Sequence, residues 1–273
     1  MPKYYGWWLP FNASAHGAAV DQMIVILHVF MAVLFVGWLA YLLLALFKFR
    51  ARPGHQAAYK THHFKAPNYI EVGIAIFEAV LLVGFSFPVF HYYRNELPPK
   101  SQALEVHIVA EQFAWNIHYP GPDGVFGKTN PALINPSNPL GLDRSDPGAK
   151  DDITMINQLH IPVGKPVLVH LRTKDVIHSF FLPVMRVKQD AIPGQTIPVW
   201  FEAAKTGKFE IACAQLCGLG HYRMRGFFFI DSKEDFAKWM AQHGKPPAPA
   251  PAAQAPIAPV GPATATPPPS VAH

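Results

Sequence analysis

The chain has 273 residues, of which 50% are hydrophobic and only 15% are charged. Because soluble globular proteins average about 25% charged residues, this composition argues against an ordinary cytosolic protein and against a charge-driven disordered one. The formal net charge is +5, yet residues 101–243 carry 14 basic and 14 acidic side chains. The basic excess therefore does not form a nucleic-acid-binding face, and we expect no nucleic-acid partner.

Two long apolar runs lie near the N-terminus. Residues 23–47 are 25 residues without a charge, and residues 72–90 are 19 residues that contain one acid, Glu78. A helix needs about 20 apolar residues to cross the hydrocarbon core of a bilayer. Asp21 before the first run and bulky residues at its end argue against a signal peptide. The sequence therefore predicts a two-helix transmembrane hairpin at 22–98, in contact with membrane lipid.

The segment between the two runs is basic. Residues 48–65 contain five Lys or Arg side chains and no acid. Because loops rich in Lys and Arg stay on the cytoplasmic side, we predict that loop 48–71 is cytoplasmic. The N-terminal segment 1–21 and all residues after 98 then lie on the outer side.

Two acids belong to the second run or its start. Glu71 and Glu78 are seven residues apart, which places them on about the same face of a helix. A carboxylate in hydrocarbon is costly unless it faces protein or water, so this face is expected to contact another membrane protein. A position at the headgroup boundary is the alternative for Glu71.

After Pro98 and Pro99 the pattern changes to short β-rich pieces separated by turn residues. Such pieces favour an antiparallel β-sandwich, which we place at 99–243. Residues 131–150 are too rich in Pro and Gly for a strand and are interpreted as an inserted loop. The predicted strands are 103–110, 112–119, 165–173, 197–204, 208–214 and 224–231.

Two further segments follow the predicted strands. Ser232, with Asp235 three residues later and apolar side chains at helical spacing, predicts a helix at 232–243 that closes the domain. The Pro/Ala-rich tail at 244–273 cannot bury a core and is predicted to be disordered.

The only two cysteines, Cys213 and Cys217, are followed at short offsets by His221 and Met224. Thiolate, imidazole and thioether ligands together favour copper. His178 is the nearest upstream histidine on a plausible neighbouring strand, so that two thiolates could bridge two ions and each imidazole could cap one. A Cys213–Cys217 disulfide and a structural zinc site are the alternatives, although neither accounts for Met224.

Three segments together resemble subunit II of the cytochrome c oxidases of the haem–copper family. They are DVIHS at 175–179, VKQDAIPG at 187–194 and the C-x3-C-x3-H-x2-M pattern at 213–224. The resemblance covers nearly the whole chain up to residue 243 and implies a cupredoxin-like sandwich after the hairpin. It also implies a dinuclear copper centre, CuA, with two copper ions. The implied ligands are the side chains of His178, Cys213, Cys217, His221 and Met224 and the backbone carbonyl of Gln215.

The resemblance also implies an activity. The chain would be subunit II of an aa3-like oxidase in the inner membrane of a bacterium, with subunits I and III as partners and its outer domain in the periplasm. It would take electrons from cytochrome c and pass them to haem in subunit I, where oxygen is reduced to water with coupled proton pumping. Phe113 and Trp115 match the region of electron uptake, and Glu71 matches a glutamate near the mouth of a proton path.

Two positions depart from the family pattern. Gln215 stands where many members have a glutamate that reaches a magnesium ion at the subunit I boundary. A neutral amide is a poorer ligand for a hard cation, which puts that magnesium site in doubt. Phe113 stands where many members have Trp, and an ordinary strand aromatic is the alternative role for both Phe113 and Trp115.

Two other functions compete with this interpretation. A quinol oxidase subunit II would lack the copper ligands, and a copper-storage protein would not need the DAIPG segment or a membrane anchor.

Because the chain has no C-x-x-C-H haem motif, the electron donor must be a separate protein. We expect some of the acids around the inserted loop to form its docking patch, and a plain solvated loop is the alternative. These acids are Asp123, Asp143, Asp146, Asp151 and Asp152.

Overall fold

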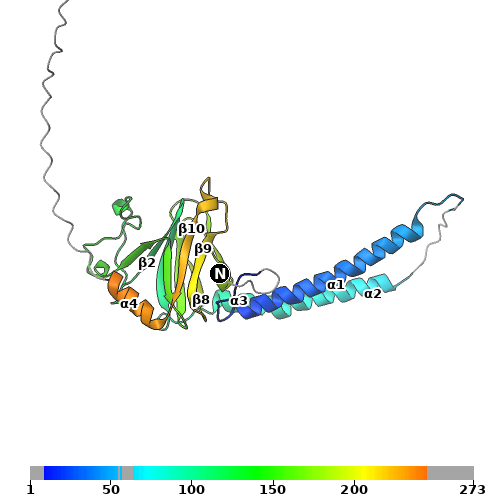
Figure 1. The fold of residues 1–273 in the computed structure, drawn as a ribbon, viewed down its shortest axis with the longest axis horizontal. Helices are drawn as coiled ribbons and strands as arrows, with labels where there is room; N and C mark the ends of the chain where they lie inside the picture. Colours follow the sequence, from blue (N-terminus) through cyan, green and yellow to red (C-terminus); the bar gives the residue numbers. More distant parts are fainter. Residues whose placement is uncertain (1–8, 55, 57–63, 245–273) are drawn as a thin grey trace, which may run out of the picture.

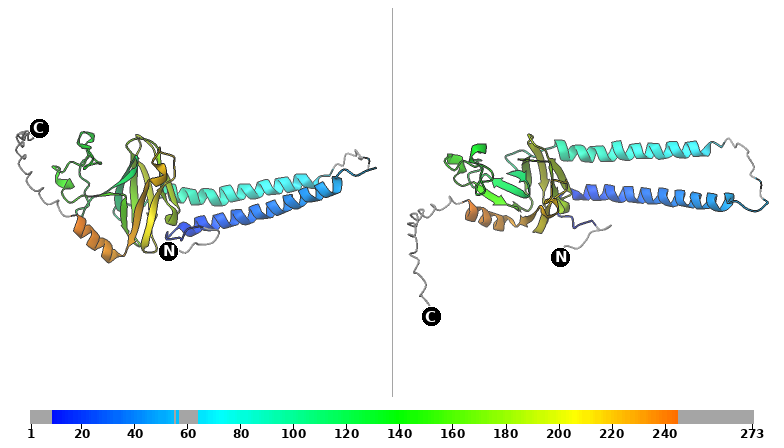
Figure 2. Two further views of the ribbon diagram at one scale, coloured as in Figure 1. Left: turned by 45° about the horizontal axis from the view of Figure 1, so that its top comes forward. Right: turned by 90° about the horizontal axis from the view of Figure 1, so that it is seen from above.

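The computed structural model describes residues 9–54, 56 and 64–244. Two long helices lie side by side and extend from one end of a β-sandwich (Figure 1 and Figure 2). The predicted disordered tail, apart from Gly244, lies outside the described residues, and so does the middle of the predicted cytoplasmic loop. The fold class predicted from the sequence, a helical hairpin followed by an all-β sandwich, is confirmed.

The hairpin contains the two predicted membrane spans. The first is α1 (Gly17–Phe49), and the second is built from α2 (Ala66–Ala79), η1 (Val80–Ser86) and α3 (Phe87–Asn95). No residue in the most apolar stretch of either span is buried, as expected for a surface that lipid or a partner protein covers. The rings of Phe30 and Phe77 pack across the hairpin with centroids 4.6 Å apart.

The second span contains one wide turn, η1, which has a π-helical backbone. Pro88, in the first turn of α3, has no N–H to donate to the carbonyl of Gly84. A local widening of the helix accommodates this lost hydrogen bond, so that the span continues beyond the proline.

Ten strands form two five-stranded sheets, with the orders β3-β2-β1-β5-β8 and β4-β10-β9-β6-β7. The first sheet consists of β1 (Leu104–Glu111), β2 (Ala114–Tyr119), β3 (Ile153–Ile156), β5 (Pro166–Thr173) and β8 (Ile197–Glu202). The second consists of β4 (Gln158–Pro162), β6 (His178–Leu182), β7 (Val187–Ala191), β9 (Gly207–Cys213) and β10 (Arg225–Asp231).

The prediction of a purely antiparallel sandwich was wrong. β1 pairs with β5 in parallel, and β10 pairs with β4 in parallel. The direction of a pair depends on how connections cross between the sheets, and the local residue pattern does not encode this. The sequence also did not predict β3, β4 and β7, which have only four or five residues each. For β6 it predicted a strand at His178 but not the bounds of that strand.

The core lies between the two sheets. Buried and partly exposed residues alternate along β1, as the two-residue period of a strand requires. The predicted C-terminal helix is present as α4 (Lys233–His243), and the Ser232 hydroxyl accepts a hydrogen bond from the backbone N–H of Asp235 at 3.0 Å. The largest fully buried side chains include Trp115, Tyr119, Phe180, Phe201 and Phe228.

A buried ion pair joins the hairpin to the sandwich. Arg186, directly before β7, has a φ of 58°, and its Nε donates to Oδ1 of Asp21 in α1 at 2.6 Å. The same guanidinium donates to the backbone carbonyls of Pro10 and Pro183 at 2.8 and 2.7 Å. The backbone N–H of Ala13 donates to the carbonyl of Val184 at 2.9 Å. The first span and the sandwich therefore form one continuous unit.

Candidate metal centre

The predicted ligands come from two neighbouring strands and one loop. His178 is the first residue of β6 and Cys213 is the last residue of β9, and these two strands pair in one sheet. Cys217, His221 and Met224 belong to the loop between β9 and β10, which includes the short helix η5 (His221–Arg223). The loop lies at one edge of the sandwich (Figure 1).

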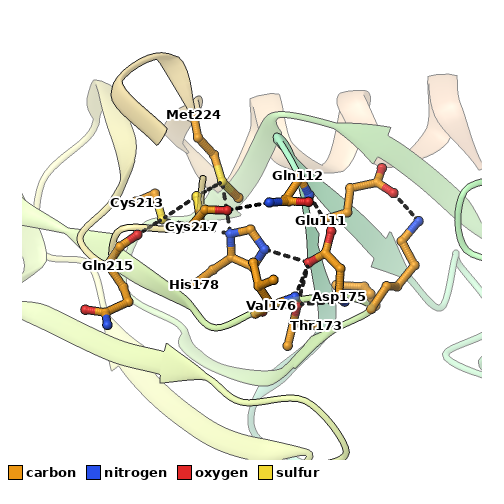
Figure 3. A network of polar contacts seen from close by, with 12 residues as sticks. Glu111, Gln112, Thr173, Asp175, Val176, His178, Cys213, Gln215, Cys217 and Met224 are labelled. Carbon is orange, nitrogen blue, oxygen red and sulfur yellow. Dashed lines mark hydrogen bonds and ion pairs between the residues drawn. The ribbon is translucent and has the colours of Figure 1, made fainter. Parts of the chain in front are cut away.

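The five predicted side chains meet at this edge (Figure 3 shows four of them). The two Sγ atoms are 3.8 Å apart, and the donor atoms of His178, Cys213 and Cys217 lie within 4.8 Å of one another. His178 Nδ1 lies 3.2 Å from Met224 Sδ and 4.0 Å from Cys213 Sγ. On the other side, Cys217 Sγ lies 3.7 Å from His221 Nδ1 and 3.7 Å from Met224 Sδ. Both cysteines are free thiols.

The cluster is shielded from solvent on its inner side. His178 is fully buried, and Cys217 and Met224 are also buried. Burial, together with the neighbouring Cys213, raises the pKa of the Cys217 thiol to about 11. A metal ion must therefore displace a proton from Cys217, as thiolate coordination generally requires.

Asp175 holds the ring of His178 from behind. Its Oδ1 lies 2.8 Å from His178 Nε2, so Nε2–H donates to the carboxylate and the Nδ1 lone pair faces the sulfurs (Figure 3). Partial burial raises the pKa of Asp175, but hydrogen bonds from His178 and from the backbone N–H groups of Gln112 and Val176 outweigh it and lower the pKa. The carboxylate is therefore charged at neutral pH.

The residues before β2 support the ligand loop. Gln112 Nε2 donates to the carbonyl of Cys217 at 2.6 Å. The Phe113 ring lies so close to the loop that a Cβ on Gly220 would be 2.3 Å from Phe113 Cδ2. Gly218 has a φ of 132°, which also requires glycine. The two glycines between Cys217 and His221 therefore let the loop fold over Phe113.

The other predicted site residues lie at different distances from the cluster. Trp115 is fully buried, with its ring centroid 6.2 Å from that of His178. The carbonyl oxygen of Gln215 is 3.2 Å from Cys213 Sγ, whereas the side-chain amide points away from the sulfurs (Figure 3). Glu71 is exposed and belongs to α2, and Figure 1 shows α2 in the half of the hairpin remote from the sandwich.

One of the expected docking acids is not on the surface. Asp152 is only 3% exposed, its Oδ2 lies 2.6 Å from His118 Nε2, and it accepts the N–H of Gly127 at 2.8 Å. It joins the segment around Gly127 to β2, so it cannot belong to an exposed acidic patch.

Sequence reasoning also missed two supporting residues, Asp175 and Gln112. The role of Asp175 could have been predicted from the sequence, because a carboxylate three residues before a histidine can reach the ring nitrogen. The role of Gln112 could not have been predicted in this way, because its hydrogen bond joins residues 105 positions apart.

The fold and the cluster define a protein with two helices long and apolar enough to span a membrane, followed by a β-sandwich whose His/Cys cluster could hold a soft metal ion. The family model for the periplasmic domain of cytochrome c oxidase subunit II matches residues 104–227. The alternative cytochrome c oxidase subunit 2 of Bradyrhizobium diazoefficiens is 34% identical over 237 residues, which cover 86% of this chain and 83% of that protein. Cytochrome c oxidase subunit 2 of Cereibacter sphaeroides is 29% identical over 217 residues, covering 74% and 68%.

A solved structure is also similar. The periplasmic domain of subunit II of the cytochrome oxidase of Bradyrhizobium japonicum is 32% identical, covers 53% of this chain and 95% of that chain, and has a TM-score of 0.39. On the sequence matches, the chain belongs to the cytochrome c oxidase subunit II family. It is therefore a component of an oxidoreductase complex that acts in electron transport, and copper is the metal of this family.

Proposed function

We propose that the chain is subunit II of an aa3-like cytochrome c oxidase and that it binds two copper ions as a CuA centre. In this proposal it accepts electrons from cytochrome c and delivers them to haem in subunit I, where oxygen reduction is coupled to proton pumping. The proposed ligands are the side chains of His178, Cys213, Cys217, His221 and Met224 and the backbone carbonyl of Gln215.

The spacing of the two sulfurs carries the proposal. Two sulfurs that are each about 2.3 Å from one tetrahedral ion lie about 3.8 Å apart. The Sγ atoms of Cys213 and Cys217 have this separation, 3.8 Å. Each sulfur has its own imidazole nearby, because His178 faces Cys213 and His221 faces Cys217. The added thioether of Met224 favours copper over zinc.

The chain's own residues prepare this site. Bound copper supplies one-electron oxidation and reduction. Asp175 keeps Nδ1 of His178 unprotonated and aimed at the sulfurs, and burial of Cys217 and Met224 keeps water from the ligands. The hydrogen bond from Gln112 to the Cys217 carbonyl and the ring of Phe113 hold the loop in shape before metal arrives.

The remaining roles belong to the same proposal. Phe113 contacts the ligand loop and Trp115 lies behind His178, so both are placed to shorten the path of an incoming electron. Glu71 is proposed to lie at the cytoplasmic mouth of a proton path, with loop 48–71 on that side. Subunits I and III cover part of the hairpin at 22–98, and the domain at 99–243 lies in the periplasm of a two-pass protein of the bacterial inner membrane.

Metal analysis and electron paramagnetic resonance of the full chain in detergent test the copper proposal. We expect two coppers per chain and the spectrum of one unpaired electron shared between them. Cys217→Ser should abolish this spectrum, and Met224→Leu should alter it, because each removes a sulfur from the cluster. Met155→Leu is the matched control, since Met155 packs against the sandwich core, and should leave copper content and spectrum unchanged. A single isolated copper per chain, or stable retention of zinc instead, would contradict the proposal.

A further inference from the structure

A cavity of about 480 Å³ lies where the hairpin meets the sandwich. Its lining comes mostly from the end of α3, from β7 and β8, and from the residue before α1. β7 and β8 are edge strands of the two sheets, and α3 reaches the sandwich at this junction (Figure 1). Cavities of this size commonly hold a small molecule or the polar part of a larger one. We call it the junction cavity.

The junction cavity lies at the end of the second span. The apolar run of this span ends at Phe90, which lines the cavity, and Tyr93 and Arg94 follow within about one turn. Trp200 of β8 also lines the cavity, and its ring centroid lies 5.7 Å from that of Tyr92. Trp and Tyr side chains gather where hydrocarbon meets water. If the hairpin crosses a membrane, the cavity therefore lies at the depth of the lipid headgroups.

Two cations of the lining form no ion pair with an acid among the described residues. Arg94 donates from Nη1 to the side-chain carbonyl of Gln189, which is a neutral acceptor. The Nζ of Lys188 lies over the ring of Phe181, 4.5 Å from the ring centroid. Both basic side chains are exposed, so their positive charge is available to an anion in the cavity.

The other charged groups of the lining leave this excess in place. Arg186 is already paired with Asp21. Burial lowers the pKa of His16 to about 4, so the His16 ring is neutral. Asp190 is the one acid among the lining residues, and the two cations described above outnumber it. The junction cavity therefore attracts negative charge.

A buried donor accompanies the two cations. Trp200 is only 9% exposed, and its indole N–H has no hydrogen-bond partner in the described part of the chain. Buried polar groups nearly always have a partner, so this donor beside a cavity indicates an acceptor that the chain itself does not supply. A guanidinium, an ammonium and an indole N–H are all donors without acceptor capacity, and a phosphate group has only acceptor oxygens to offer them.

We infer that the junction cavity binds the phosphate of an anionic phospholipid from the outer leaflet, with Arg94, Lys188 and Trp200 as its donors. The acyl chains of the lipid would then pass the apolar end of the span at Phe90. This inference rests on the proposed membrane position of the hairpin, and it goes beyond the proposed electron transfer. The lipid would act as a filler between the hairpin and the sandwich, at the place where the two parts meet.

Native mass spectrometry of the full chain in detergent tests the inference, with phosphatidylglycerol and phosphatidylcholine as probes. We expect one phosphatidylglycerol per chain, held at least about fivefold more tightly than phosphatidylcholine, because only the former carries a net negative charge. Excess inorganic phosphate should not displace it, because free phosphate has no acyl chains to bury. Equal affinity for the two lipids, or displacement by inorganic phosphate, would overturn the inference.

Substitutions locate the lipid. Arg94→Gln/Lys188→Gln should weaken phosphatidylglycerol binding by about tenfold or more, because each basic side chain near an anionic lipid contributes about fivefold. Trp200→Phe keeps an aromatic ring but removes the N–H, and should weaken binding by about threefold. Lys128→Gln/Lys150→Gln is the matched control, because it removes two exposed positive charges from the segment between β2 and β3, remote from the hairpin (Figure 1).

Near-ultraviolet circular dichroism without added lipid should be the same for all these variants, which shows that they fold. Unchanged phosphatidylglycerol affinity in Arg94→Gln/Lys188→Gln would refute the inference. In the assembled oxidase, loss of subunit I from this double variant with no loss of bound lipid would also overturn it, because an acidic side chain of the partner would then fill the cavity.

Two further readouts separate this inference from the proposed function. If the chain does not stay with the membrane fraction, the proposed membrane position fails, and the lipid inference fails with it. If the chain stays there with a normal copper spectrum and holds no phosphatidylglycerol, only the lipid inference fails. If it holds the lipid but shows no copper spectrum, the copper proposal fails and the lipid inference stands.

Discussion

The carboxylate of Asp175 touches no sulfur, yet it decides which nitrogen of His178 faces the cluster. Such partners of a ligating histidine fix its tautomer and orientation, and their loss commonly lowers metal affinity about 10- to 100-fold. We therefore expect Asp175→Ala to weaken copper binding by about tenfold or more, measured by competition with a chelator. Glu234→Ala, an exposed acid at the start of α4, should leave the affinity unchanged. Equal affinities for the two variants would show that Asp175 has no part in holding His178.

At this scale the sequence was most informative about the ligands themselves. The spacing of Cys213, Cys217, His221 and Met224 required one compact loop, and the structure has that loop. The contacts that support it were not predictable in the same way. The packing of Phe113 against Gly220 and the bond from Gln112 to Cys217 depend on which strands become neighbours.

Among the elements, the outer face of the first sheet carries a row of three histidines. His107 pairs in register with His118 on β2 and with His170 on β5. His118 contacts Asp152 and His170 contacts Glu105, while the ring of Phe126 stacks on His107 at 3.8 Å. Burial, with help from His118, His170 and Arg172 and against the attraction of Glu105, lowers the pKa of His107 to about 4.

This row predicts acid sensitivity of the sandwich. The unfolded chain takes up a proton on His107 below about pH 6.5, whereas the folded chain does so only near pH 4. The contribution of His107 to the free energy of unfolding should therefore fall as pH drops from about 6.5 to about 4, and it should level off below that. His107→Gln should reduce this slope in denaturant titrations at a series of pH values, and His243→Gln, on exposed α4, should not. Identical slopes for wild type and His107→Gln would contradict the prediction.

The strands show where local patterns stop being sufficient. Long alternating or apolar strands such as β1 and β10 were predictable, because their period is clear over seven or eight residues. β7 has five residues and includes Lys188 and Asp190, so it has almost no apolar signal. The parallel pairing of β1 with β5 was not predictable, because it depends on connections that pass through the rest of the sandwich.

For the whole molecule, the ion pair between Arg186 and Asp21 determines how the sandwich sits on the hairpin. Both side chains are almost fully buried, so Asp21→Asn leaves a buried guanidinium without its counter-ion. We expect a loss of about 3 kcal/mol in the free energy of unfolding, measured on the full chain in detergent. The double variant Asp21→Leu/Arg186→Met should recover part of that loss.

A second ion pair supplies the control. Arg225 and Glu210 have a similar contact at 3.1 Å but are about 60% exposed. Glu210→Gln should therefore cost no more than about 1 kcal/mol. If Asp21→Asn also lowered the free energy of unfolding by no more than about 1 kcal/mol, the pair between Asp21 and Arg186 would not be what holds the hairpin to the sandwich.

The close attachment of hairpin and sandwich has a consequence for the lipid environment. α1 has 33 residues and is thus about 50 Å long, whereas the hydrocarbon core is about 30 Å thick. A helix of this length tilts further in a thinner bilayer. Because only residues 96–103 separate α3 from β1 and α1 is clamped to Arg186, the sandwich must swing with the helices. In a membrane, the thickness of the bilayer would therefore change the height and angle of the loop between β9 and β10 above the lipid surface.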